Sequence, residues 1–531
     1  MAKRVAVIGA GLSGLAAVKC CLEEGLEPTC FEQSKDLGGL WRFTEEVEDA
    51  RASIYRSLVS NTSKEMMAYS DFPFPEDFPT YLHNAKVLDY LRRYAEQFGL
   101  LKYIQFKTKV CGVRRRPDFL TTGQWEVITE TEGEQDSAVF HAVLVCAGHH
   151  AKVNLPLESF SGIERYKGSY CHSREYKNPK AYEGRRVLVV GLGNSAADLA
   201  VEVSRTAAKV FLSTRHGSWV LTRVADDGYP IDMIYAIRFQ FWVRNHLPKA
   251  LAFWIIEKKM NQWFNHANYG LQPKDRSTMT EPVVNDFLPS HILSGAVTVK
   301  PKVSEFGETW ASFEDNTREE IDDVIFATGY IISYEFLQEM VLQADVGKFT
   351  LYKNVFSPSL EKPTLAFIGL VRPLGPIPST AELQARWAVR VFKGMVHLPS
   401  SSCMINYIHR MKEERAKWFG TGKSQIPISD YISYLDEVAD EIGVRPSLSL
   451  FLNDFKLATK VFFGPCTPYQ YRLTGPGVWK GARQAILTQW ERTVKPTKTR
   501  VVHESPKTAF SWRLLMIIGL LALALGGLFS R

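Results

Sequence analysis

The sequence lacks the cysteine spacings that mark structural zinc sites or redox-active disulfides. Its eight cysteines include no C-x-x-C pair, and Cys20 and Cys21 are adjacent. Buried thiols in a reducing compartment account for this pattern better than a disulfide framework does. The pair His149 and His150 is accompanied by no second cluster of ligands, so we predict no metal site.

Low-complexity tracts are absent, and the only internal repeat is a glycine motif that occurs twice. We find no convincing acid–base pair and no Ser/His/Asp constellation. With 531 residues, 45% of them hydrophobic and 23% charged, the chain is long enough for two or three domains with their own cores.

The first glycine motif lies in "VAVIGAGLSGLAAV", which begins at Val5. An apolar strand runs into Gly9-x-Gly11-x-x-Gly14, and a helix of small residues follows. The next strand, "PTCFE", ends at Glu32, where a carboxylate can accept a hydrogen bond from a ribose hydroxyl. The motif therefore predicts a dinucleotide site, which we assign to FAD, formed by Gly9, Ala10, Gly11, Leu12, Ser13, Gly14 and Glu32.

The second motif lies in "VLVVGLGNSAADLAVEV", which begins at Val187. Here Arg215, and not an acid, follows the next strand, "AKVFLST". We call each glycine turn with the start of its helix a cradle, the first at residues 9–14 and the second at residues 191–196. A guanidinium can bind a 2′-phosphate that a carboxylate would repel, so the second cradle predicts NADPH. Arg215 could instead be an ordinary surface arginine, and Arg223 is a weaker candidate for the same role. The expected NADPH-binding residues here are Gly191, Gly193, Ser195, Ala196, Ala197, Asp198 and Arg215.

Two cradles in one chain indicate a flavin in one and the nicotinamide that reduces it in the other. The segments "AVLVCAGHH" and "DVIFATGY" each run from an apolar strand into a turn, as crossings between nested domains would. We therefore expect an α/β fold with two nested Rossmann-like domains. The predicted ranges are a flavin domain at 1–155 and 330–445, an NADPH domain at 156–329 with an aromatic insertion at 225–290, a C-terminal extension at 446–510 and a membrane anchor at 511–531.

The anchor is predicted from "LLMIIGLLALALGGLF", sixteen uncharged and almost wholly apolar residues after Arg513. This length leaves open whether the tail crosses the bilayer as a helix or lies in its interface. Six basic and two acidic residues between positions 491 and 513 indicate that the catalytic body stays cytosolic. The apolar run at the N-terminus belongs to the glycine motif, so we predict no cleaved leader.

The segment "YKGSYCHSREY", Tyr166 to Tyr176, resembles the F-x-G-x-x-x-H-x-x-x-(F/Y) signature of flavin-containing monooxygenases, with Tyr166 in place of the usual Phe. "FEQSKDLGGLWRF", "VSNTSKEMM", "ELQARW" and "FGPCTPYQYRLTGPG" are similar to the vertebrate microsomal members. The resemblance covers essentially the whole chain. It implies an FAD-containing, NADPH- and O₂-dependent enzyme of the endoplasmic reticulum membrane. Such enzymes form a flavin hydroperoxide that converts lipophilic tertiary amines to N-oxides and thioethers to S-oxides.

The same resemblance assigns roles to "VSNTSKEMM". Asn61 is the expected catalytic residue, since its amide can donate to the peroxide or the nicotinamide; Ser60 is expected beside the NADP and Thr62 beside the FAD. Asn61-Thr62-Ser63 also reads as a glycosylation sequon, which a buried cytosolic position disfavours. Leu40 and Trp41 are expected near the flavin, although Trp41 could be plain core. For His172 we favour a structural role over proton donation.

Within the insertion, residues 232–270 are unusually aromatic, and "KALAFWIIEKKMNQWF" has helical apolar spacing. The segment could pack on its own domain, or it could dip into the bilayer beside the tail and line a route for lipophilic substrates. We favour a mixture of the two. The oligomeric state and the physiological substrate are left open.

Three other functions are compatible with parts of this pattern. A Baeyer–Villiger enzyme would oxygenate ketones, but those enzymes usually end the linker signature in Trp where this chain has Tyr176. A membrane-bound flavin dehydrogenase would pass electrons to a quinone, and a dinucleotide sensor would have lost its chemistry. The linker signature and "VSNTSKEMM" disfavour the dehydrogenase, and the intact Glu32 and Asn61 positions disfavour the sensor.

Overall fold

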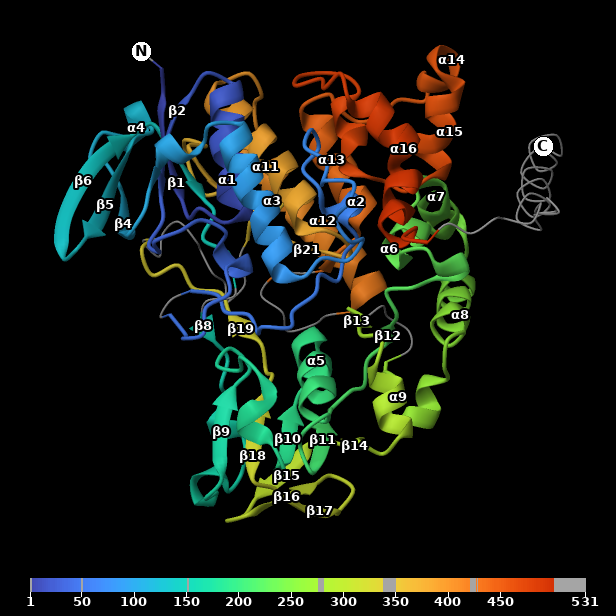
Figure 1. The fold of residues 1–531 in the computed structure, drawn as a ribbon. Helices are drawn as coiled ribbons and strands as arrows, with labels where there is room; N and C mark the ends of the chain where they lie inside the picture. The colour runs from blue at the N-terminus through green and yellow to red at the C-terminus, as the bar shows by residue number, and fades with distance from the viewer. Residues whose placement is uncertain are drawn as a thin grey trace.

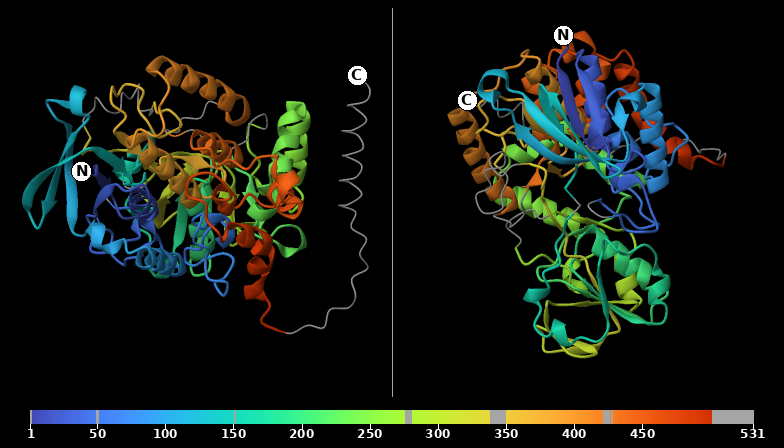
Figure 2. Two further views of the ribbon diagram at one scale, coloured as in Figure 1. Left: turned by 90° about the horizontal axis from the view of Figure 1, so that it is seen from above. Right: turned by 90° about the vertical axis from the view of Figure 1, so that its left-hand side faces the viewer.

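The protein is described by a computed structural model that covers residues 2–48, 51–149, 152–275, 281–337, 350–420, 426 and 428–500. Two lobes are visible, one above the other (Figures 1 and 2). Each lobe is built around a five-stranded parallel sheet. The central strands of both sheets, β1 and β7 in one and β10 and β18 in the other, are short runs of mainly Val, Ile, Leu and Ala that are almost wholly buried, as expected for parallel sheets with both faces covered.

The first sheet has the strand order β20-β7-β1-β2-β3. Helices α1 (Leu12–Glu23) and α11 (Ile377–Phe392) pack together on it. Strands β1, β2, β3 and β7 come from residues 4–145, whereas β20 comes from residues 365–367, beyond the second lobe in the chain. The strands are β1 Arg4–Ile8, β2 Glu27–Phe31, β3 Ile104–Gln105, β7 Ala142–Val145 and β20 Leu365–Phe367.

The second sheet forms the lower lobe in Figure 1 and has the order β14-β11-β10-β18-β9. Helix α5 (Asn194–Val203) packs against β10 and β11. A three-stranded antiparallel sheet closes the bottom of the lobe. The strands are β9 Ser169–His172, β10 Arg186–Val190, β11 Lys209–Ser213, β14 Val297–Lys300, β18 Asp323–Phe326, and, in the small sheet, β15 Val303–Phe306, β16 Trp310–Phe313 and β17 Arg318–Glu320.

The two connections between the lobes run side by side. Strand β8 (Lys152–Val153) leaves the first lobe and pairs antiparallel with β19 (Tyr330–Ile331), which returns to it. Asn154 and Thr328 reinforce this pair, since each side chain bonds the backbone carbonyl of the other residue. The prediction of an α/β fold with parallel, Rossmann-like sheets is confirmed.

The remaining elements of the first lobe surround its sheet. Helix α3 buries Val87, Tyr90, Leu91 and Tyr94, the spacing of one helical face, against the core. An antiparallel sheet of β4 to β6 flanks the lobe at the left of Figure 1. The bounds are α2 Lys64–Met67, α3 Asn84–Gln97, α4 Phe119–Thr122, β4 Thr108–Arg115, β5 Trp125–Thr131, β6 Glu134–Phe140, β21 Arg372–Pro373 and β22 Ile428–Ser429.

The aromatic insertion forms short helices at the right of Figure 1, beside the C-terminal helices. Helix α7 packs against α15, and Phe239 contacts the ring of Phe463 there. The insertion contains α6 Ile231–Tyr235, α7 Arg238–His246, α8 Lys249–Met260, β13 Val283–Val284 and the first residues of α9 Leu288–Leu293, and β12 Val220–Leu221 precedes it. The C-terminal helices are α12 Ser401–Phe419, α13 Tyr431–Glu441, α14 Leu450–Asn453, α15 Phe455–Phe463 and α16 Ala482–Val494.

Helices α15 and α16 contribute to the core of the first lobe. Leu457, Val461 and Ile486 belong to the same buried apolar cluster as Val5 and Leu15. Across the described ranges, no helix is both long and apolar enough to cross a bilayer. The predicted membrane helix at 511–531 lies outside the described residues.

Candidate functional site

The first glycine cradle lies at the carboxyl edge of the first sheet, where β1 turns into α1. Gly9 adopts a positive φ of 99°, and a Cβ there would lie 2.9 Å from the carbonyl oxygen of Cys146. A Cβ on Gly14 would lie 1.8 Å from the oxygen of Gly9, so this glycine lets the helix pack directly on the turn. No side chain caps the N-terminus of α1, and its first turn carries no acid. Its free N–H groups therefore suit a pyrophosphate.

Glu32 closes this cradle from the end of β2. Its carboxylate accepts a hydrogen bond from the backbone N–H of Ala10 at 2.8 Å and two from Ser34. The turn that contains Leu40 and Trp41 lies against the same loop, because the N–H of Gly38 donates to the oxygen of Ala10 at 3.0 Å. The structure thus brings together the residues predicted for FAD around the first turn of α1: Gly9, Ala10, Gly11, Leu12, Ser13, Gly14, Glu32, Leu40 and Trp41.

The second cradle repeats this geometry where β10 turns into α5. Gly191 has a φ of 120°, and a Cβ there would lie 2.6 Å from the oxygen of Ala327. Gly193 precedes the helix without a side-chain cap, and open space surrounds the position of its missing Cβ. Ala196 is fully buried, so the third position of the motif serves helix packing. A second phosphate group can approach this backbone closely.

The side chains around the second cradle have different surroundings. Ser195 and Arg215 are exposed, and Arg215, which follows the end of β11, forms no ion pair with the described residues. Ala197 is buried in the helix interface. Asp198 faces inward instead, where Tyr55 donates to one carboxylate oxygen and Asn285 to the other. Asp198 therefore links α5 to the rest of the molecule.

Hydrogen bonds to main-chain carbonyl oxygens fix the segment that contains Asn61. Ser60 is buried; its N–H donates to the oxygen of Leu82, and its hydroxyl donates to the oxygen of Thr62 at 2.9 Å. Further along, the hydroxyl of Tyr69 donates to the oxygen of Leu12 at 2.6 Å. This bond holds the segment against the first turn of α1, next to the first cradle.

An arginine two residues after β12 contacts this segment. Arg223 donates from Nη2 to Oδ1 of Asn61 at 2.7 Å and from Nε to the oxygen of Ser60 at 3.1 Å. Its Nη1 is paired with Asp286 at 2.7 Å. The sequence pattern suggested Arg223 only as a partner for a 2′-phosphate and gave no signal for Asp286. No local pattern could have linked residues more than sixty positions apart.

Asp232 reaches the same segment from the start of α6. One of its carboxylate oxygens accepts the N–H of Ser63 at 2.7 Å, and the other is buried without a hydrogen-bond partner among the described residues. Burial raises the pKa of Asp232 to about 6, because the hydrogen bonds that its carboxylate accepts, first that from Ser63, offset only part of the lost hydration.

We expect the substitution Asp232→Asn to stabilise the protein at pH 8. A carboxyl whose pKa is raised in the folded state contributes stability that is complete below its unfolded pKa and is lost as pH rises through about 6. The amide keeps an acceptor for Ser63 without this loss. The gain in the free energy of unfolding is about 2–3 kcal/mol at pH 8 and roughly half of that at pH 5. Urea denaturation measures it, with the exposed Asp77→Asn as control; a gain independent of pH contradicts the assignment.

His172 is fully buried and fully hydrogen-bonded. Its Nδ1 accepts the N–H of Arg174 at 3.1 Å, so Nε2 carries the proton and donates to the oxygen of Gly329 at 3.0 Å. Burial lowers the pKa of this imidazole, which stays neutral. The histidine thus ties β9 to the connection between the lobes, in line with a structural role.

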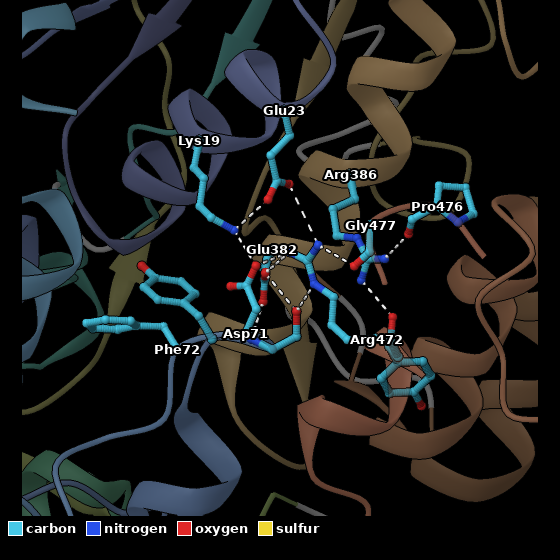
Figure 3. A network of polar contacts seen from close by, with 12 residues as sticks. Lys19, Glu23, Asp71, Phe72, Glu382, Arg386, Arg472, Pro476 and Gly477 are labelled. Carbon is cyan, nitrogen blue, oxygen red and sulfur yellow. Dashed lines mark hydrogen bonds and ion pairs between the residues drawn. The ribbon is translucent and has the colours of Figure 1, made fainter. Parts of the chain in front are cut away.

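Two buried arginines from the C-terminal part hold the residues that follow Asn61. Arg472 donates to the hydroxyl of Ser70 at 2.6 Å and to Glu382 at 2.8 Å, and lies 3.1 Å from Asp71 (Figure 3). Arg492 forms a two-point contact with the fully buried carboxylate of Glu65. The position of the Asn61 segment therefore depends on residues more than 400 positions away.

Each parallel sheet carries a glycine turn and an uncapped helix N-terminus that can bind a pyrophosphate, and the Asn61 segment connects the two. This arrangement is typical of a flavoprotein oxidoreductase with a second nucleotide site. The Flavin-binding monooxygenase-like family matches residues 2–529. The chain belongs to this family, and the prediction of a flavin-dependent monooxygenase is confirmed.

Known proteins of two kinds are similar to the chain. It is 57% identical to dimethylaniline monooxygenase [N-oxide-forming] 2 of Mus musculus, over 100% of this chain and 99% of the relative. It is also 57% identical to flavin-containing monooxygenase 1 of Canis lupus familiaris, over 95% and 96% of the two chains. The solved structure of S-allyl-L-cysteine S-oxygenase from Allium sativum shares the fold, with a TM-score of 0.65 and 22% identity over 93% of this chain and 99% of that one.

Proposed function

We propose that the protein uses NADPH and O₂ to oxygenate soft nucleophiles, converting lipophilic tertiary amines to N-oxides and thioethers to S-oxides. The observation that carries this proposal is a pair of contacts made by the Asn61 segment. Asn61 accepts a hydrogen bond from Arg223, whose partner Asp286 lies two residues from the Val284 that is bonded to the start of α5, and Tyr69 bonds Leu12 in the first cradle. The N-oxide-forming name of the mouse relative, which matches along its whole length, supports this class of substrate.

The first cradle fits FAD. The open N-terminus of α1 would bind the pyrophosphate, and Glu32 would turn a carboxylate oxygen to the ribose. Leu40, Trp41 and Thr62 would contact the ring system. When bound, the flavin supplies the chemistry of accepting hydride and activating oxygen. The buried walls of this lobe keep water away from the reacting atoms.

The second cradle fits NADPH. The first turn of α5, including the exposed Ser195, would bind the pyrophosphate. Arg215 is exposed, unpaired with the described residues and placed at the carboxyl end of β11, where it can reach a 2′-phosphate. Asp198 supports the cradle from beneath through Tyr55 and Asn285.

Asn61 would act by donating a hydrogen bond. Its oxygen is taken by Arg223, so the amide N–H groups are available to the oxygen atom that is transferred or to the nicotinamide. The chain needs no general base for this reaction, because a tertiary amine or thioether attacks with its own lone pair.

Isotope labelling tests the proposed function. The flavin-loaded enzyme is supplied with NADPH, ¹⁸O₂ and a thioether, and we expect one labelled oxygen in the sulfoxide per NADPH oxidised. A cyclic ketone offered in parallel tests the Baeyer–Villiger alternative, whose product would be a labelled lactone. Oxidation of NADPH with no label in any organic product would overturn the proposal.

We also propose that the insertion and the tail at 511–531 attach the enzyme to the endoplasmic reticulum membrane, with the catalytic body in the cytosol. Support comes from α7 and α8, which expose Trp242 and Trp254 by 53% and 58%. Lys258 lies over the ring of Trp254, the arrangement of an interfacial anchor.

Vesicle binding tests the role of the insertion. A chain ending at residue 510 should still bind phosphatidylcholine vesicles, and the double substitution Trp242→Ser with Trp254→Ser should weaken this binding about tenfold. Leu120→Ser, an exposed apolar residue on α4, is the control. Absence of vesicle binding by the shortened chain would remove the insertion from the membrane site.

A further inference from the structure

The guanidinium of Arg223 has all three nitrogens engaged. Nη2 donates to Asn61, Nε to the carbonyl of Ser60 and Nη1 to the carboxylate of Asp286. The side chain is only 11% exposed. One planar group thus bonds both the backbone and the side chain of the segment on which the proposed reaction depends.

The chemistry of this contact fixes the orientation of the Asn61 amide. A guanidinium carries donors only, so the atom of Asn61 that faces it must be the carbonyl oxygen Oδ1. The two N–H groups on Nδ2 then point away from Arg223. Rotation of the amide by 180° would set donor against donor and lose a charge-assisted hydrogen bond.

We propose that Arg223 and Asp286 are positioning residues that keep Asn61 turned with its amide N–H groups toward the reacting oxygen. The inference rests on the proposed function, because the donor role of Asn61 belongs to that function. Without Arg223 the amide is free to present its acceptor, which stabilises neither a developing anion nor a peroxide oxygen.

Asp286 holds Arg223 in this position. Its carboxylate accepts from the hydroxyl of Thr222 at 2.8 Å, from the backbone N–H of Arg223 at 2.7 Å and from the guanidinium at 2.7 Å. The pair is mostly buried, so the charge of the arginine is balanced where water cannot screen it.

The segment that carries Asp286 is itself fixed to the second cradle. Asn194, the first residue of α5, accepts the N–H of Val284 at 2.8 Å, and Asn285 donates to Asp198 one turn further along the same helix. Helix α5, which follows Gly193, therefore sets the position of Asp286, and through Arg223 the orientation of Asn61.

The test compares Arg223→Met with wild type in the flavin-loaded enzyme. We expect the share of oxidised NADPH that appears as hydrogen peroxide to rise at least fivefold, while the KM for NADPH changes less than threefold. Arg223→Lys keeps the charge and one donor nitrogen and should restore part of the coupling. Arg93→Met, a half-exposed arginine paired with Asp89 on α3, is the matched control.

Two further readouts separate positioning from loss of structure. Arg223→Met in an Asn61→Ser background should add no further peroxide release, because Arg223 acts through Asn61. Hydrogen exchange of the peptide spanning residues 58–66 should quicken in Arg223→Met with FAD bound and no NADPH present. Additive peroxide release in the double variant, or unchanged exchange, would overturn the inference.

Asp286→Asn decides the question if Arg223→Met does not retain flavin. This nearly isosteric change removes the charge that holds the guanidinium and should give peroxide release between wild type and Arg223→Met; wild-type coupling in Asp286→Asn would refute the pair's role. The proposed function has a separate failure: wild type would then incorporate no label from ¹⁸O₂. If wild type incorporates label normally and Arg223→Met also remains fully coupled, only the positioning role is refuted.

Discussion

Replacing Asn61 with serine or aspartate is expected to leave the flavin bound while NADPH oxidation yields hydrogen peroxide in place of oxygenated product. Serine is too short to place a donor where the amide nitrogen stands. Aspartate is nearly the same shape but has no donor when ionised, and Arg223 would keep it ionised. Loss of one donor to a developing oxyanion typically costs about 10²–10³ in rate. We therefore expect at least a tenfold loss of coupled oxygenation, with FAD content unchanged.

The measurement is the ratio of sulfoxide to hydrogen peroxide per NADPH oxidised, with FAD content read from the visible spectrum. Asn453→Ser, on the exposed face of α14, makes the same chemical change away from the site and should behave as wild type. Full oxygenation of a thioether by either Asn61 variant would show that its amide is not the donor.

The substitution Arg492→Met is expected to cause the largest loss of stability. Its guanidinium contacts both oxygens of Glu65, at 3.0 and 2.6 Å, and the carboxylate is fully buried beside the hydroxyl of Tyr469. Methionine fills similar space and leaves that charge without its partner. Removing one member of a buried ion pair costs about 3–5 kcal/mol. We expect a matching drop in the free energy of unfolding measured with urea.

Two variants isolate the buried charge as the cause. Arg483, on the same helix as Arg492, forms a solvent-exposed pair with Asp454, and Arg483→Met should therefore cost far less stability than Arg492→Met. Adding Glu65→Gln to Arg492→Met removes the stranded charge and should recover part of the loss. A double variant less stable than Arg492→Met alone would rule out this explanation.

Sequence predicted the parts of the site that are made by contiguous residues. Each glycine motif specifies its own turn, since Gly9 and Gly191 need a positive φ and the helix that follows begins within three residues. Glu32 was found because its distance from the motif along the chain is set by one helix and one strand. Local chemistry of this kind is visible in a single sequence.

The residues that orient the site had no such signal. Arg223 is 162 positions from Asn61, and Asp232 is 169 positions from Ser63. Both contacts depend on how the insertion folds back over the first lobe, which is a matter of tertiary packing. Arg492 was counted in a basic flank of the membrane tail, yet it is buried against Glu65, because charge counting cannot distinguish a solvated arginine from a paired one.

The contact between Arg492 and Glu65 joins residues 427 positions apart in the chain. At roughly 5–20 residues per second, a ribosome makes that stretch in about 20 to 90 s. Throughout this interval the carboxylate of Glu65 has been synthesised and the arginine that neutralises it has not, so the lobe cannot bury this charge in its final pairing. A stop codon at or before position 492 would therefore leave Glu65 without this partner, although the nucleotide motif of the same lobe had been translated first.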